Sequence, residues 1–203
     1  MREIYQSGAT PQQKLVGVNK KFGNTGIKDQ QGTTRIIYDA LPTGTATTFR
    51  FFEDSSSRRF PFTNTGSDGN KLGVGDTMVV AQVMFYLVDI NNTSGQANFG
   101  GVNQFPLSGT TQSLGLFSFE IANNRVIKNV PLTEGLAAFD KTTTPTGQSN
   151  IELETQIVIP PLLNYVLELR IPSAIAAAAA GSTRYLYAAI IGTGGIIAPR
   201  TTF

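Results

Sequence analysis

The chain of 203 residues contains no histidine, no cysteine and no tryptophan. Without histidine and cysteine it lacks the most common general base, the thiol nucleophile and the usual ligands of zinc and copper. A Ser–His–Asp triad and disulfide bonds are excluded for the same reason. These absences favour a binding or structural protein over an enzyme, and we expect no cofactor.

Charge is also scarce. Only 15% of the residues are charged and the formal net charge is +2, which is too close to neutral to indicate a nucleic-acid-binding protein. Residues 1–35 nevertheless carry six basic and two acidic side chains, six minus two giving +4, so the remainder is −2. This basic segment is either a solvated arm or a contact for phosphate groups or an acidic neighbour.

Long hydrophobic runs are missing as well. A membrane-spanning helix needs roughly 20 consecutive apolar residues. The longest candidate, Met78–Ile90, is too short and contains Gln82 and Asp89. The N-terminal sequence has no apolar core of the kind that signal peptides use. We therefore expect no transmembrane segment and no secretion by the usual N-terminal route.

What the chain does contain is a series of short apolar, β-branched and aromatic runs separated by turn-forming residues. The run at 77–90 is nearly continuous and is typical of a strand buried on both faces or bent across a sandwich. The eight predicted strands are Thr34–Tyr38, Ala46–Phe52, Thr77–Ile90, Leu114–Ile121, Arg125–Val130, Ile151–Ile159, Tyr165–Ile171 and Arg184–Ile191.

Two β-hairpins are expected among these strands. Asn123-Asn124 suits a type I′ turn between the fourth and fifth strands, because asparagine tolerates positive φ. Residues 160–164 would join the sixth and seventh. The run Ala174–Ala180 is the only helical candidate, and an extended small-residue segment explains it equally well.

These elements predict an all-β fold, an antiparallel β-sandwich that is jelly-roll-like with about eight strands. An immunoglobulin-type sandwich is less favoured, because it usually contains a buried tryptophan and often a cysteine pair. The expected organisation is an extended N-terminal arm at 1–33, a sandwich domain at 34–191 and an extended C-terminal tail at 192–203. Two polar loops, Asn91–Ser113 and Leu132–Asn150, are unusually long and are candidates for contacts with partners.

One catalytic arrangement remains open in this composition. Glu152 and Glu154, with Glu120 or Glu168 on a neighbouring strand, would form an acid/base pair for glycoside hydrolysis. The same spacing is that of the solvent face of an antiparallel strand.

Three further sequence patterns allow a functional interpretation, but each signal is weak. Gly66–Gly75 lacks the spacing of a phosphate loop and more simply shapes a turn. Its Asp68 and Asn70, with Asp76 beyond it, would suit calcium but match no EF-hand. Arg58-Arg59, flanked by Phe60 and Phe62, would suit single-stranded nucleic acid, although solvated charges beside core phenylalanines explain the pattern equally well.

The layout resembles that of virus coat proteins, with small bacteriophage capsid and capsid-associated proteins the most similar in style. The features that carry the resemblance are the basic Gly/Gln-rich arm, the β-rich body with long Asn/Thr/Gly loops, and the extended tail. It implies a jelly-roll-like subunit repeated in a closed shell and located in the virion. The arms would reach onto neighbouring subunits, and the basic side would face the genome.

The leading hypothesis is therefore a virion structural protein whose partners are copies of itself, other virion proteins and packaged nucleic acid. The residues expected to make the arm contacts are Arg2, Lys14, Lys20 and Lys21. The alternatives are a receptor- or carbohydrate-binding module that uses the two long loops, and a carboxylate-dependent glycoside hydrolase.

Overall fold

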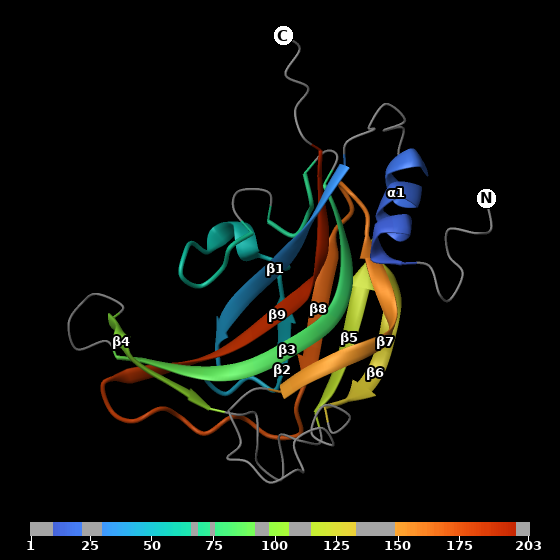
Figure 1. The fold of residues 1–203 in the computed structure, drawn as a ribbon. Coiled ribbons are helices and arrows are strands. Elements are labelled where there is room, and N and C mark those ends of the chain that lie inside the picture. Colours follow the sequence, from blue (N-terminus) through green and yellow to red (C-terminus); the bar gives the residue numbers. More distant parts are fainter. Residues whose placement is uncertain are drawn as a thin grey trace, which may run out of the picture.

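The computed structural model describes residues 10–21, 30–65, 69–73, 76–91, 98–105, 115–132 and 149–197. Within these ranges the chain forms an α-helix, α1 (Pro11–Lys21), a short 3-10 helix (Ser55–Ser57) and nine strands (Figure 1). The strands are β1 (Gln30–Pro42), β2 (Thr48–Phe51), β3 (Thr77–Asn91), β4 (Asn98–Phe105), β5 (Leu116–Ile121), β6 (Asn124–Pro131), β7 (Ser149–Ile159), β8 (Tyr165–Arg170) and β9 (Ser182–Ile197).

The strands form two antiparallel sheets. The wide sheet has the order β1-β9-β3-β4, with β7 also paired to β3. The narrow sheet has the order β2-β8-β5-β6. The predicted all-β antiparallel sandwich is therefore confirmed, and each of the eight predicted strands has a counterpart.

The order of pairing is nested. With β4 set aside, the first strand pairs with the last, β1 with β9, and the second with the second-last, β2 with β8. Next, β3 pairs with β7, and the two middle strands, β5 and β6, pair with each other. Successive pairs belong alternately to the wide and the narrow sheet. A long antiparallel ribbon rolled up in this way is a jelly roll.

Aromatic side chains join the two sheets across the core. The ring of Phe85 on β3 lies 6.1 Å from that of Phe51 on β2 and 5.9 Å from that of Phe117 on β5. All three side chains are fully buried. Burying one such ring stabilises the fold by about 1.5–3 kcal/mol. These contacts therefore hold the layers together.

The most apolar run of the sequence becomes the most extensively paired strand. Strand β3 pairs with β9, β7 and β4, and its register shifts between Val80 and Gln82, which marks a bulge. Val79 and Val80 are consecutive, point to opposite faces, and are both buried. Burial on both faces, as the sequence predicted, is confirmed.

The hairpin between β5 and β6 is confirmed, but its turn begins one residue earlier than predicted. Ile121 pairs with Asn124, so the turn residues are Ala122 and Asn123, with φ of 49° and 66°. A type I′ turn needs positive φ at both central positions. Strand pairing fixes a two-residue loop here, and it holds even an alanine in that conformation.

The second predicted hairpin is wrong, because β7 belongs to the wide sheet and β8 to the narrow one. The two prolines at 160 and 161 have no N–H to donate to a tight hairpin turn. Instead, the Leu162 N–H donates to the carbonyl of Leu72 (2.9 Å), and the Tyr165 N–H donates to that of Asn70 (3.0 Å). The connection thus crosses between the sheets and is held by residues 70–72.

Residues 11–21 form a helix, where the sequence predicted an extended arm. Thr10 and Gln13 make a capping box: the Thr10 N–H donates to Gln13 Oε1 (2.9 Å), and the Gln13 N–H donates to Thr10 Oγ1 (3.3 Å). Pro11 is well suited to the first helical position. Helix α1 contacts β3, β9 and β7 of the same chain, and Leu15 is 1% exposed. This part of the segment therefore packs on its own wide sheet (Figure 1).

The predicted boundaries also change elsewhere. Strand β9 continues to Ile197, so residues 192–197 are paired with β1 and are not a free tail. Strand β4 lies inside the segment predicted to be a long loop. The run 174–180 has no helix, and its Ile175 is buried in the core. Seven residues are too few for a helix without strong caps.

Candidate functional site

The outer face of the narrow sheet gathers charged side chains from several elements. Along β8, Leu167 and Leu169 point into the core, so Glu168 between them points to the opposite face. Salt bridges connect it with Arg50 on β2, Arg125 on β6 and Arg170 on its own strand, and the same arginines of β2 and β6 also contact Glu120 on β5. We call this set the charged face; its members are Arg50, Glu53, Glu120, Arg125, Glu168 and Arg170.

Glu168 is the centre of the charged face. Its Oε1 lies 2.6 Å from Arg170 Nε and 3.8 Å from Arg125 Nη2, and its Oε2 lies 3.4 Å from Arg50 Nη1. The Glu168 side chain is only 4% exposed. A buried carboxylate is costly unless it is paired and hydrogen-bonded. Contact with three guanidinium groups explains how it is accommodated.

The remaining carboxylates are also paired. Arg125 Nε lies 2.6 Å from Glu120, and Arg50 Nε lies 2.8 Å from Glu53. The hydrogen bond to Glu120 raises the pKa of Arg125 above its usual value. The charged face therefore contains equal numbers of arginine and glutamate and is neutral as a whole. Each carboxylate is held by an arginine, so the arrangement suits recognition better than acid/base chemistry.

The predicted glycosidase pair is not assembled. Glu152 and Glu154 are exposed on β7 of the wide sheet, whereas Glu120 and Glu168 lie on the narrow sheet. The described neighbour of the Glu152 carboxylate is Gln82, with Nε2 to Oε1 at 3.4 Å. The alternation of β7 is therefore that of a solvent-facing strand. The two glutamates of β7 lie on one sheet, and Glu120 and Glu168 lie on the other.

Aromatic side chains gather on the part of the wide sheet's outer face that β1, β3 and β9 form. Tyr86 and Tyr187 stack with ring centroids 5.1 Å apart, and Tyr38 lies 6.0 Å from Tyr187. Phe62 covers Tyr185 at 4.9 Å. Burial raises the pKa of Tyr38, Tyr86 and Tyr187 above the usual value of tyrosine. These hydroxyls therefore stay neutral under ordinary conditions.

Arg58 does not form part of an open platform for nucleic acid. Its Nε and Nη2 donate to the two oxygens of Asp39 at 2.9 and 2.6 Å, and the Phe52 N–H donates to Asp39 at 2.7 Å. Asp39 is fully buried, so this pair fixes residues 52–58 against β1. The expectation of a core phenylalanine is wrong for Phe60, which is 82% exposed.

The four basic residues predicted to make arm contacts are not brought together into a described cluster. Lys14 lies in α1, where it is partly buried. Lys20 and Lys21 occupy the last positions of α1, and their side chains lie outside the described part of the structure. Arg2 lies outside the described residues altogether.

The predicted calcium ligands are only partly described. Asp68 lies outside the described residues, and Asp76 pairs with Arg35 at 3.1 Å. Among the described residues, no group of three acidic side chains gathers in a way that would hold a metal ion. The same residues contain no helix that is long and apolar enough to cross a membrane.

Sequence reasoning missed most of the charged face. Arg50 and Glu168 meet although they are 118 positions apart in the chain. The local signal was an arginine or glutamate between two apolar residues, as in Phe49–Phe51 and Leu167–Leu169. That signal predicts that the charged side chain points away from the core, but it does not identify its salt-bridge partner. No protein-family model matches the sequence, and no characterised protein shows significant similarity to it.

Proposed function

We propose that the protein is a virion structural subunit, a phage capsid or capsid-associated protein that assembles with copies of itself. The observation that carries the proposal is the charged face. A patch with equal numbers of arginine and glutamate is complementary to a second copy of itself. A two-fold contact places the same patch of both subunits together, so each arginine finds a carboxylate on the partner.

The exposed parts of the charged face are suited to such a contact. The side chains of Arg50, Arg125 and Arg170 are 41%, 36% and 52% exposed. Glu53 is 43% exposed. These groups keep donors and acceptors available at the surface, while Glu168 beneath them anchors the arginines. Contacts of this kind are individually weak, and repetition around a symmetric shell makes them sufficient.

Two edge strands, β1 and β6, carry protective features, which favours contact through faces over pairing of strands. Asn64 caps β1: its Oδ1 accepts from the Tyr38 N–H (2.8 Å), and its Nδ2 donates to the Ile36 carbonyl (2.8 Å). Edge strand β6 contains Lys128, a positive φ of 50° at Asn129, and a terminal proline. Lysine, proline and irregular backbone are common devices against edge-to-edge aggregation. A subunit made in many copies needs such protection.

The fold is compatible with the proposal but does not select it. Jelly rolls form viral capsid domains, and they also form lectins and cupins. Function therefore has to be argued from the surface and not from the architecture. The basic residues Arg2, Lys14, Lys20 and Lys21 would add contacts to neighbours or to packaged nucleic acid through phosphate charge.

The test is self-association of the purified chain, measured by sedimentation velocity and negative-stain imaging. Arg170→Glu places a like charge in the proposed contact, and we expect it to weaken association by at least about tenfold. The matched control is Glu154→Arg, a reversal at an exposed position of the wide sheet. Salt at about 1 M should weaken wild-type assembly as well, because it screens exposed charges.

Two outcomes would contradict the proposal. The first is a wild-type monomer at high concentration. The second is an equal response of Arg170→Glu and Glu154→Arg. A monomer with a positive glycan-array signal would favour the receptor- or carbohydrate-binding alternative. For the basic residues, charge reversal of all four should reduce binding to nucleic acid and flatten its salt dependence.

A further inference from the structure

A small cavity lies between β1, residues 64–65 and 71–72, and the start of β8. Its volume is about 80 Å³, far below the roughly 300 Å³ of a typical small-molecule site. Arg35, Ile37, Asn64, Leu72 and Tyr165 are among the lining residues. A cavity of this size suits one small functional group and not a sugar or a nucleotide.

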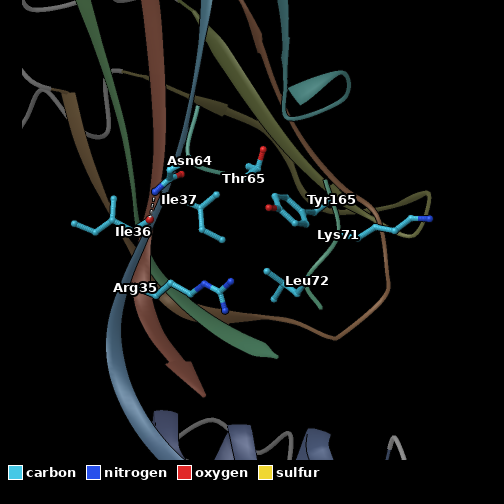
Figure 2. A pocket seen from close by; sticks show the side chains of 8 residues that line it. All are labelled: Arg35, Ile36, Ile37, Asn64, Thr65, Lys71, Leu72 and Tyr165. Atoms are coloured by element: carbon cyan, nitrogen blue, oxygen red, sulfur yellow. Dashed lines mark hydrogen bonds between the residues drawn. The ribbon is translucent and has the colours of Figure 1, made fainter. Parts of the chain in front are cut away.

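The Tyr165 hydroxyl is the most informative group in the cavity. The residue is 1% exposed, and its ring packs against Phe52 with centroids 5.3 Å apart. Figure 2 shows the hydroxyl pointing into the space between Ile37 and Leu72. The hydrogen bonds found among the described residues include none to this oxygen. Burial raises the pKa of Tyr165, so the group stays protonated and is available as a donor.

Arg35 supplies further donors from β1, across the cavity from Tyr165. Its guanidinium reaches toward the cavity in Figure 2, and only Nη1 is engaged, by Asp76 at 3.1 Å. Lys71 also lines the cavity, but its ammonium group points away from it (Figure 2). The positive charge that faces the space therefore comes from Arg35.

Acceptors are missing from the interior of the cavity. Asn64 is already engaged at both ends of its amide, because its Oδ1 accepts from the Tyr38 N–H and its Nδ2 donates to the Ile36 carbonyl. The Thr65 hydroxyl lies 3.1 Å from Thr63 Oγ1, whose own hydrogen is donated to the Tyr38 carbonyl (3.0 Å), so Thr65 donates to Thr63. Its oxygen points away from the space in Figure 2. The cavity thus offers the Tyr165 hydroxyl and those Arg35 donors that Asp76 does not engage.

We propose that this cavity binds a carboxylate group, held by the Arg35 guanidinium and the Tyr165 hydroxyl. The planar fork of arginine matches the two oxygens of a carboxylate, and the phenol adds a donor from a fixed, buried position. The carboxylate comes either from a small free acid or from an acidic side chain of another copy of this chain. The chemistry of recognition is the same for both.

The test is isothermal titration of the full-length protein with sodium acetate at constant ionic strength, with sodium chloride and phosphate as comparison anions. We expect saturable binding of acetate at one site. Tyr165→Phe removes one oxygen from the cavity and should weaken binding about tenfold, the effect of one hydrogen bond to a charged group. Arg35→Gln should abolish it. Lys71→Ala is the matched control and should change the affinity less than about twofold, because its charge is solvated.

A variant that should bind acetate more tightly guards against mistaking a loss of folding for a loss of binding. Asp76→Asn frees the Arg35 guanidinium and should tighten acetate binding, while circular dichroism verifies each fold. The two sources are separated by sedimentation: if the carboxylate belongs to another copy, acetate and Tyr165→Phe both reduce self-association, and if it is a free acid, neither does. The proposal is overturned by the absence of saturable acetate binding, by equal affinity of wild type and Tyr165→Phe, or by binding of phosphate in preference to acetate.

Discussion

The two sheets stabilise their buried carboxylates in different ways. On β1 of the wide sheet, Asp39 has a single guanidinium partner, Arg58, and one backbone donor, the Phe52 N–H. On the narrow sheet, Glu168 is contacted by three arginines, which reach in from β2 and β6 and from its own strand. An isolated pair fixes one segment in one position. In a shared network, the remaining partners compensate in part when one member is removed.

The outer faces of the two sheets also differ in the side chains they present. Tyr38, Tyr86 and Tyr187 form an aromatic row on the wide sheet, and the arginines and glutamates of the charged face cover the narrow sheet. A tyrosine row is insensitive to salt and sensitive to alkaline pH. An ion network responds to salt and to charge reversal. Salt should therefore act mainly on the charged face of the narrow sheet, and alkaline pH mainly on the tyrosine row of the wide sheet.

The largest effect is expected from the backbone of the wide sheet. A Cβ at Gly192 would lie 1.8 Å from the Val79 carbonyl oxygen, beside the bulge of β3. Gly192→Val should therefore lower the free energy of unfolding by about 4 kcal/mol, measured by urea denaturation. Gly32→Ala is the control, because its Cβ would meet only Thr193 Cγ2 at 3.5 Å. Equal stability of the two variants would show that the sheet can shift to accommodate the side chain.

The isolated pair should be the next most sensitive feature. Asp39→Asn removes the charge that faces Arg58 inside the protein and replaces one acceptor oxygen by a donor. We expect a loss of about 3 kcal/mol, because breaking a buried pair leaves the other charge uncompensated. Asp54→Asn, at an exposed neighbouring position, should have an effect below about 0.5 kcal/mol. A small effect of Asp39→Asn would mean that water reaches Arg58 and replaces its partner.

The network on the narrow sheet should respond less. Glu168→Gln should cost about 1–2 kcal/mol, because the three arginines remain partly exposed to water, and Arg50 and Arg125 keep other carboxylate partners. Glu53→Gln should cost less than about 0.5 kcal/mol, and salt at 1 M should remove that difference. If Glu168→Gln lowered the free energy of unfolding as much as Asp39→Asn, the idea that the remaining partners compensate for a lost member would be wrong.

Local patterns were sufficient to place the strands. The predicted strand Leu114–Ile121 and the apolar run of β3 are recognised from neighbouring residues, and the structure has a strand at each place. The capping signals of α1, Thr10 followed by Pro11 and Gln13, are equally local. They were available in the sequence, but the weaker helix formers at 16–19, Val-Gly-Val-Asn, concealed them.

The pairing of strands was not available locally. The assignment of β7 and β8 to different sheets depends on where residues 70–72 lie, because these residues accept the hydrogen bonds of the connecting segment. The charged face depends on the register between β2, β8 and β5. The cavity around Tyr165 likewise assembles from three distant segments. Turn chemistry and periodicity specify elements, whereas a site arises from contacts between elements far apart in the chain.

The smallest effect is expected from the tyrosine row, and its sign follows from the pKa shifts. Burial, with a further contribution from Tyr38, raises the pKa of Tyr86 above its ordinary 10.0. The native state therefore holds the proton more tightly than the unfolded state does. Its stability contribution is fully present below pH 10 and is lost as the pH rises through the higher native pKa.

Tyr86→Phe removes this titration while keeping the ring in its stack with Tyr187. At pH 7 its unfolding free energy should match that of the wild type. At pH 11, one unit above the unfolded pKa, the variant should be the more stable protein by at most about 1.4 kcal/mol. Urea denaturation at the two pH values, with tyrosinate absorbance followed in parallel, measures the difference. A variant that tracks the wild type at both pH values would show that alkaline sensitivity does not reside in the aromatic face, and that the contrast between the two faces is one of salt response alone.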